Sequence, residues 1–98
     1  MNIEKECMGN AIALKVSGRL DTTTAPTLET AVSESVANCD ALVLDFAGLE
    51  YISSAGLRVI LKAQKAMAAK GGMTIKNVNE TIMEIFEITG FSDILTIE

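Results

Sequence analysis

The spacing of apolar residues along the chain alternates between a period of two, typical of strands, and one of three to four, typical of helices. Residues 2–7, NIEKEC, show a weak strand pattern, and residues 8–10, MGN, are turn residues. In residues 11–17, AIALKVS, the side chains of Ile12, Leu14 and Val16 fall on one face. These segments predict a β-hairpin, and Gly18 then breaks the alternating pattern.

A helical period follows in residues 22–39, TTTAPTLETAVSESVANC. Thr24 is expected to accept a hydrogen bond from a free backbone N–H of the first turn. Pro26 lies at an early position, where its missing N–H costs nothing. The residues that share one face of this predicted helix are Leu28, Ala31, Val32, Ser35 and Val36.

The middle of the chain combines a strand pattern with a longer helix pattern. Residues 41–46, ALVLDF, form a nearly continuous apolar run, which is the pattern of a central strand covered on both sides. Residues 54–72, SAGLRVILKAQKAMAAKGG, then predict a helix with Gly71 as its stop. Its apolar stripe consists of Leu57, Ile60, Leu61, Gln64, Met67 and Ala68.

The last quarter of the chain repeats this alternation. Residues 73–78, MTIKNV, predict a short strand, and residues 79–90 predict a helix capped by Asn79 and ended by Gly90. The inward side chains of that helix are expected to be Ile82, Ile85, Phe86 and Thr89. Residues 93–98, DILTIE, close the chain as an edge strand or a frayed end. The order ββαβαβαβ indicates an α/β fold whose sheet is mostly parallel, with right-handed crossovers.

Length and charge narrow the classes of protein that need to be considered. The chain has 98 residues, of which 49% are hydrophobic, and this predicts one domain over residues 1–98. A net charge of -5 repels polyanions, so nucleic acid and anionic membrane surfaces are not expected partners. The start, MNIEKE, lacks the basic and apolar regions of a leader, and Asp45 interrupts the apolar run ALVL. A cytoplasmic protein is therefore expected.

The residue types that usually carry catalysis or bind metals are scarce. The chain contains no histidine and no CxxC motif, so we expect no metal and no cofactor. Asp21 and Asp45 lie near predicted strand ends and could bind a metal or act in acid–base chemistry, although loop and cap roles are commoner. Cys7 and Cys39 could form a disulfide, but buried free cysteines are the favoured interpretation. No nucleophile and base are paired, so we do not expect an enzyme.

Residues 51–57, YISSAGL, place two hydroxyls and a glycine where a strand meets a helix. One serine is readily explained as a helix cap. Gly56 is less easily explained, because glycine in a helix costs up to about 1 kcal/mol relative to alanine. It therefore predicts that a neighbouring strand, or another protein, approaches the backbone closely. A serine at a helix N-terminus is also suited to phosphorylation, because the positive end of the helix dipole favours added negative charge.

Three stretches of the sequence resemble the STAS domain, as found in bacterial anti-sigma-factor antagonists. LVLDFAGLEYISSAGLRVIL, residues 42–61, is similar to the central signature, in which a strand leads to an Asp-Ser-x-Gly-Leu turn and a helix. VSGRLDTTTAP resembles the Gly-x-Leu/Ile-Asp segment before the first helix, and IFEITGFSDIL resembles the Phe-x-x-x-Gly ending. The resemblance covers nearly the whole chain. It implies a SpoIIAA-like single domain, with an N-terminal β-hairpin, a mostly parallel sheet and helices largely on one side.

The resemblance implies a partner switch. In that family, the unphosphorylated antagonist binds an anti-sigma factor that is also a serine kinase of the histidine-kinase-like ATPase fold, which frees a sigma factor. Phosphorylation of the antagonist releases the kinase, and a metal-dependent serine phosphatase reverses the modification. The acceptor is the serine two positions before the motif glycine, which is Ser54 when that glycine is Gly56. Ser53 is the second choice.

The same resemblance implies the partner-binding residues. They are Asp21, Thr22, Thr23, Ser53, Ser54, Ala55, Gly56, Leu57 and Arg58. Two positions depart from the family pattern: Ser53 replaces the frequent Asp before the acceptor, and Arg19 stands where antagonists often carry Glu. An alternative that keeps the fold is a STAS docking subunit of a transporter or of a stressosome-type complex, without control of a sigma factor. An enzyme or small-molecule binder is the third class, for which the sequence offers no constellation of polar groups.

Overall fold

The strands and helices of the computed structural model, which describes residues 1–98, follow the predicted order ββαβαβαβ. A short 3-10 helix, η1, is the only element that the sequence pattern did not indicate. The elements are β1 (Asn2–Met8), β2 (Ala11–Leu20), α1 (Ala25–Asn38), β3 (Ala41–Ile52), α2 (Ser54–Ala68), β4 (Met73–Lys76), α3 (Glu80–Thr89), η1 (Phe91–Asp93) and β5 (Thr96–Ile97).

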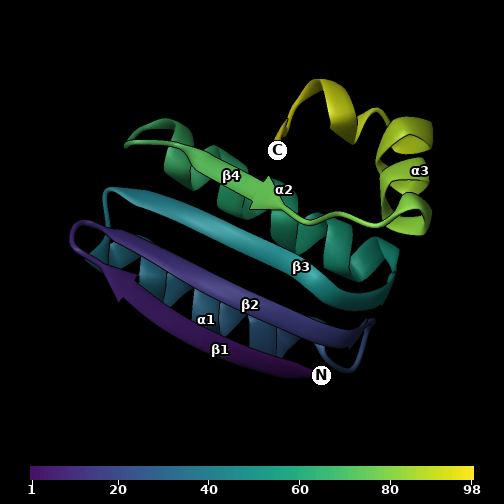
Figure 1. Cartoon of the computed structure of the whole chain (residues 1–98), viewed down its shortest axis with the longest axis horizontal. Helices are drawn as coiled ribbons and strands as arrows, with labels where there is room; N and C mark the ends of the chain where they lie inside the picture. The colour runs from purple at the N-terminus through teal and green to yellow at the C-terminus, as the bar shows by residue number, and fades with distance from the viewer.

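The five strands form one sheet in the order β1-β2-β3-β4-β5. β1 and β2 are the antiparallel hairpin, while the three other neighbouring pairs are parallel. β3 is the middle strand, which confirms the prediction that residues 41–46 lie in a central strand. In Figure 1, α1 and α2 both lie behind the sheet, so the prediction of helices largely on one side is also confirmed.

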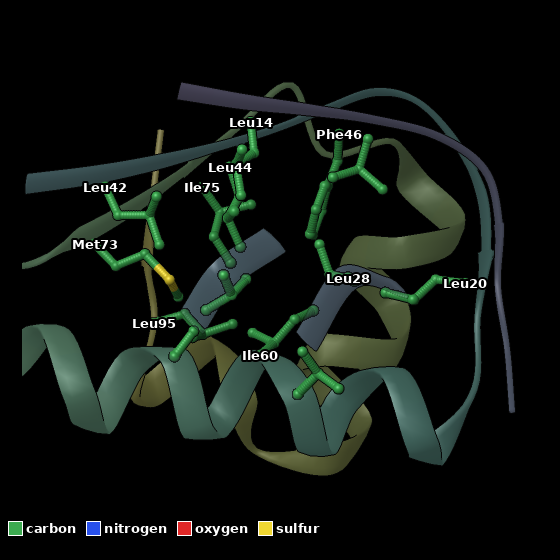
Figure 2. Packing of buried hydrophobic residues seen from close by; sticks show 14 of the residues in the cluster. Leu14, Leu20, Leu28, Leu42, Leu44, Phe46, Ile60, Met73, Ile75 and Leu95 are labelled. Carbon is green, nitrogen blue, oxygen red and sulfur yellow. The ribbon is translucent and has the colours of Figure 1, made fainter. Parts of the chain in front are cut away.

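The core lies between the sheet and these helices. Leu14, Leu44 and Ile75 are directly paired neighbours on β2, β3 and β4, and none is more than 1% exposed. Figure 2 shows this row pointing toward α2, which carries Ile60. The buried apolar residues form a single cluster that also includes Phe46 of β3 and Phe86 of α3. Burial of this area is the main stabilising contribution to the fold.

The expectation that β3 is covered on both sides is wrong. Leu42, Leu44 and Phe46 are fully buried toward the helices, but the alternate residues Val43 and Asp45 are only partly buried. The other face of the sheet has no helical layer. Val43 is shielded there by its neighbours on β2 and β4, since a cross-strand neighbour covers much of a side chain. β3 also continues to Ile52, so Asp45 lies inside the strand and not at its end.

The open face of the sheet carries a row of charges of alternating sign. Glu4 pairs with Lys15, Lys15 with Asp45, and Asp45 with Lys76 in the strand register. The row ends where Lys76 Nζ lies 3.9 Å from Glu98 Oε1. Each charge thus has neighbours of opposite sign, an arrangement that favours cross-strand pairing and keeps this face hydrated.

Local turn chemistry departs from the sequence expectations at three positions. Gly18 does not end its strand: it adopts a left-handed backbone (φ +92°) where the register of β2 with β3 shifts, and the strand continues to Leu20. The left-handed residue after α2 is Gly72 and not Gly71, and the Gly72 N–H donates to the Met67 carbonyl. Thr89 is exposed, because its hydroxyl donates to the Ile85 carbonyl on the helix surface.

Other local expectations are confirmed. Asn79 caps α3 by accepting from the Ile82 N–H at 2.9 Å, and Gly90 ends it with a left-handed backbone. Both cysteines are free, and Cys39 is buried as expected. Cys7 is exposed, contrary to the expectation, because it lies on the edge strand β1, most of whose side chains face solvent.

Asp45 is expected to make the free energy of unfolding depend on pH in the acid range. The Asn77 side-chain amide donates to Asp45 Oδ1 at 3.0 Å, and with the Ala47 N–H and the nearby Lys15 and Lys76 it holds the pKa of Asp45 below its ordinary value. The charged form therefore adds stability above about pH 4, and this contribution is lost as pH falls through the lowered pKa.

The corresponding test compares wild type with Asp45→Asn by urea unfolding between about pH 6 and pH 2. The variant should be less stable at pH 6, and its deficit should shrink as the pH falls. Asp93→Asn, which removes an exposed carboxylate outside this network, is the control. A deficit that is constant with pH would contradict the prediction.

Candidate functional site

Two loops meet where β2 and β3 end side by side. Leu20 pairs with Ile52 at the last position of the parallel ladder, and the Ser53 N–H donates to the Leu20 carbonyl at 2.8 Å. The residues that follow, 21–24 and 53–58, therefore lie next to each other. In Figure 1 they occupy the right-hand end of the molecule, at the ends of β2 and β3. We call residues 21–24 and 53–58 the junction site; it contains every predicted partner-binding residue.

The two serines of the junction site have different environments. Ser53 is the N-cap of α2, and its partly buried hydroxyl oxygen accepts from the Gly56 N–H at 3.4 Å. Ser54 is the first residue of α2, is exposed, and makes no side-chain hydrogen bond within the chain. The Ser54 hydroxyl can thus be reached by an enzyme without breaking a cap, while the Ser53 hydroxyl is engaged.

Gly56 is required by the packing of α2 on the strand ends. A Cβ at this position would lie 2.6 Å from Cγ of Leu20 and 3.0 Å from Cγ1 of Ile52. Of the two close approaches that the sequence allows, the structure shows the intramolecular one. Gly56 and the neighbouring Leu57 are both buried. Gly56 and Leu57 therefore pack the first turn of α2 against the core and are not part of the exposed surface of the junction site.

Asp21 organises the loop before α1. Its Oδ1 accepts from the Thr23 hydroxyl at 2.7 Å and from the backbone N–H groups of Thr23 and Thr24 at 3.0 and 3.2 Å. These hydrogen bonds lower the pKa of Asp21, and the bond from the Thr23 hydroxyl contributes most. The expectation that Thr24 caps α1 with its side chain is wrong. The Thr24 hydroxyl instead accepts from the Asp21 N–H and donates to the Arg19 carbonyl, so α1 has no side-chain cap. The N–H of its first residue, Ala25, donates to the Asp21 backbone carbonyl.

Arg19, one of the two departures from the family pattern, is held at the edge of the site. Its guanidinium lies 4.4 Å from the centroid of the Tyr51 ring, and its Nε lies 3.9 Å from Oδ2 of Asp21. The contact with the ring is a cation–π interaction. Arg19 therefore bridges the ends of β2 and β3, and its charge is directed toward Asp21.

A groove between α1 and α2 opens beside Ser54, with a volume of about 360 Å³. Its lining residues include Thr22, Ala25 and Pro26 on one side and Ala55, Arg58 and Val59 on the other. Glu29 and Lys62 also line it and form an ion pair across the two helices, with Lys62 Nζ 3.0 Å from Glu29 Oε1. The predicted set of partner-binding residues does not contain Ala25, Pro26, Glu29, Val59 or Lys62. Among these, only Pro26 carried a sequence signal, which placed it at the start of the first helix.

The acidic and cysteine side chains of the chain are not clustered as metal ligands. No three or more histidine, cysteine, aspartate or glutamate side chains are grouped so that they could hold an ion. The carboxylates of Asp21 and Asp45 are each occupied by hydrogen bonds from their own surroundings. None of the helices has the length and apolar character of a membrane-spanning segment.

Comparison with known proteins relates the whole chain to one family. The family model described as the STAS domain matches residues 2–98. The chain is 29% identical over 100 residues to the anti-sigma F factor antagonist of Paenibacillus polymyxa, and the alignment covers 99% of this chain and 86% of the relative.

Solved structures agree with this comparison. An anti-sigma factor antagonist from Mycobacterium paratuberculosis superposes with a TM-score of 0.90 at 25% identity, covering 98% of this chain and 83% of the other. SpoIIAA, an anti-sigma factor antagonist and Bacillus cell fate determinant, has the same fold at 16% identity. Its unphosphorylated form gives a TM-score of 0.83 with 99% and 88% coverage, and its phosphorylated form gives 0.77 with 99% and 91%.

Proposed function

This chain belongs to the STAS domain family, and from that membership we propose that it is an anti-sigma-factor antagonist working by partner switching. In its unphosphorylated form it binds an anti-sigma factor through the junction site. Phosphorylation of Ser54 releases that partner. The relatives are named as antagonists, which are regulatory binding proteins and not enzymes.

The exposure of the Ser54 hydroxyl is the observation that carries this proposal. Ser54 begins α2 without a hydrogen bond from its side chain, beside a loop fixed by Asp21. A kinase needs a hydroxyl that is free to attack ATP, and Ser54 meets this condition better than the capping Ser53. SpoIIAA, with the same fold, has been obtained in both phosphorylated and unphosphorylated forms.

The proposed partner is an anti-sigma factor that is also a serine kinase of the histidine-kinase-like ATPase fold. A metal-dependent serine phosphatase would restore the binding form. The cytoplasm is the proposed location of this chain and of both partners. A pull-down with the unmodified chain, analysed by mass spectrometry, should recover an ATPase-type kinase.

Phosphorylation is expected to require Ser54 and not Ser53. Incubation of Ser54→Ala with the kinase and ATP should leave no phosphate on residues 51–58 in fragment mass spectrometry. Ser53→Ala should still be modified, but more slowly, because the start of α2 loses its cap.

The matched control is Ser53→Asn, which removes the second hydroxyl but keeps a capping oxygen. It should be phosphorylated at nearly the rate of the wild type. If both Ser53 variants remain unmodified while Ser54→Ala takes up phosphate, the acceptor is Ser53 and the proposed assignment is wrong.

A further inference from the structure

The cations around the junction site are not equally available to a partner. Arg19 is engaged by Tyr51 and Asp21, and Lys62 is engaged by Glu29. Arg58 is exposed and has neither an ion pair nor a side-chain hydrogen bond. It also lines the groove between α1 and α2. In a chain of net charge -5, Arg58 is thus the uncommitted positive charge at this groove.

Arg58 is also placed to reach a group attached to Ser54. The two residues are four positions apart on α2, and side chains at this spacing are neighbours on one helix face. A phosphate carries about -1.5 to -2 charge at neutral pH and three strong acceptor oxygens. The fork of an arginine guanidinium binds such oxygens in pairs, with charge-assisted hydrogen bonds.

We propose that Arg58 docks an acidic side chain of the anti-sigma factor in this groove, and that a phosphate on Ser54 releases the partner by binding Arg58 itself. This inference rests on the proposed function and names the contact through which it works. The occupant is acidic because the groove presents one free guanidinium between small side chains from both helices, Ala25 and Ala55 among them. The Glu29–Lys62 pair limits the groove at its far end.

Competition between the two anions favours the phosphate. A partner carboxylate carries one negative charge and must come from another molecule. The phosphate carries more charge and is attached four residues away, so its effective concentration at Arg58 is in the millimolar range or above. The phosphate therefore does more than repel the partner, since it also removes the cation that the partner needs.

Binding of the purified anti-sigma factor to four forms of the chain tests the docking contact. These are wild type and Arg58→Gln, each with Ser54 unmodified and phosphorylated. Arg58→Gln should weaken binding of the unmodified chain about tenfold or more, because a partner carboxylate is left unpaired. The same variant should make the effect of phosphorylation about tenfold smaller than in wild type. Lys65→Gln, which removes a cation of α2 outside the groove, should change neither value.

Two results of this binding experiment would overturn the inference. One is binding of unmodified Arg58→Gln within twofold of wild type. The other is an effect of phosphorylation that is equal or larger in the variant, which is the result expected if the phosphate acts by repulsion alone.

A titration of the free chain tests the intramolecular contact without any partner. Phosphoserine is installed at position 54 during translation, and the pKa of its phosphate is followed by phosphorus NMR. Arg58 in contact with the dianion should hold that pKa at least about half a unit lower in wild type than in Arg58→Gln. Equal values would overturn the inference. If no anti-sigma factor binds the chain, the proposed function and the docking contact both fail, while a shifted titration still establishes the contact between residues 54 and 58.

Discussion

A phosphate on Ser54 is expected to weaken binding of the anti-sigma factor by about a hundredfold or more, while the melting temperature of the free chain barely changes. Ser54 is exposed at the first position of α2, so its phosphate stays hydrated in the free protein. Negative charge at a helix N-terminus adds only about 0.3 to 1 kcal/mol of stability. Asp21, whose lowered pKa keeps it ionised, offsets part of that gain by repulsion across the two adjoining loops.

The complex responds differently because docking removes water from the same phosphate. An incompletely paired buried charge costs several kcal/mol, and each 1.4 kcal/mol is a factor of ten in affinity. Titration calorimetry measures the affinity, and a melting curve measures the stability of the same samples. Ser54→Ala should bind about as tightly as wild type. Phosphorylated chain that binds within threefold of unmodified chain, or that melts many degrees earlier, would contradict this account.

Gly56→Ala is expected to destabilise the fold by about 1 to 2 kcal/mol, although alanine is the better helix former. The helix propensity favours alanine by up to about 1 kcal/mol. The added methyl would, however, meet Leu20 Cγ at 2.6 Å, and Leu20 is fully buried. Overpacking of this kind typically costs about 1 to 3 kcal/mol, and the clash at the branch carbon of a buried side chain puts this case at the upper end.

Urea unfolding measures the loss, and a double-mutant cycle identifies its cause. Ala55→Gly, one position earlier in the same turn, is the matched control, because it changes the propensity without a clash. It should cost no more than about 1 kcal/mol. In Gly56→Ala combined with Leu20→Ala, the loss should be smaller than the sum of the two single losses, since the methyl would then fill space left by Leu20. Additive losses, or a Gly56→Ala variant more stable than wild type, would contradict the packing explanation.

The elements that the sequence predicted well are those whose signals are local. Asn79 and Gly90 bound α3 as expected because a cap and a left-handed stop depend on a few adjacent residues. Thr24 was assigned the wrong partner because its hydroxyl bonds to the Asp21 N–H and the Arg19 carbonyl, both of which lie outside the helix. The outcome depends on where the Arg19 carbonyl lies, and that is fixed by the pairing of β2 with β3.

The placement of the elements relative to one another was harder to predict from the sequence. The apolar run of residues 41–46 gave the central position of β3, but it could not show that one face of the sheet lacks helices. Within the junction site, the spacing to Gly56 favoured Ser54 and left Ser53 as the second choice. The structure adds a difference that the spacing could not show, because the Ser53 hydroxyl caps α2 while that of Ser54 makes no hydrogen bond within the chain. The groove was not predicted either, because Glu29 and Lys62 lie 33 residues apart in the chain.

The two outer strands of the sheet also affect how copies of the chain meet one another. An unpaired strand edge is a template for aggregation or domain swapping unless it is short or charged. β5, at one edge, has only two residues, Thr96 and Ile97. β1, at the other, would place Lys5 opposite Lys5 of a second copy, and Glu4 opposite its Glu6, if two such strands paired antiparallel about Lys5. Like charges directly opposite disfavour that pairing, so neither edge is a good template for extending the sheet into a fibre.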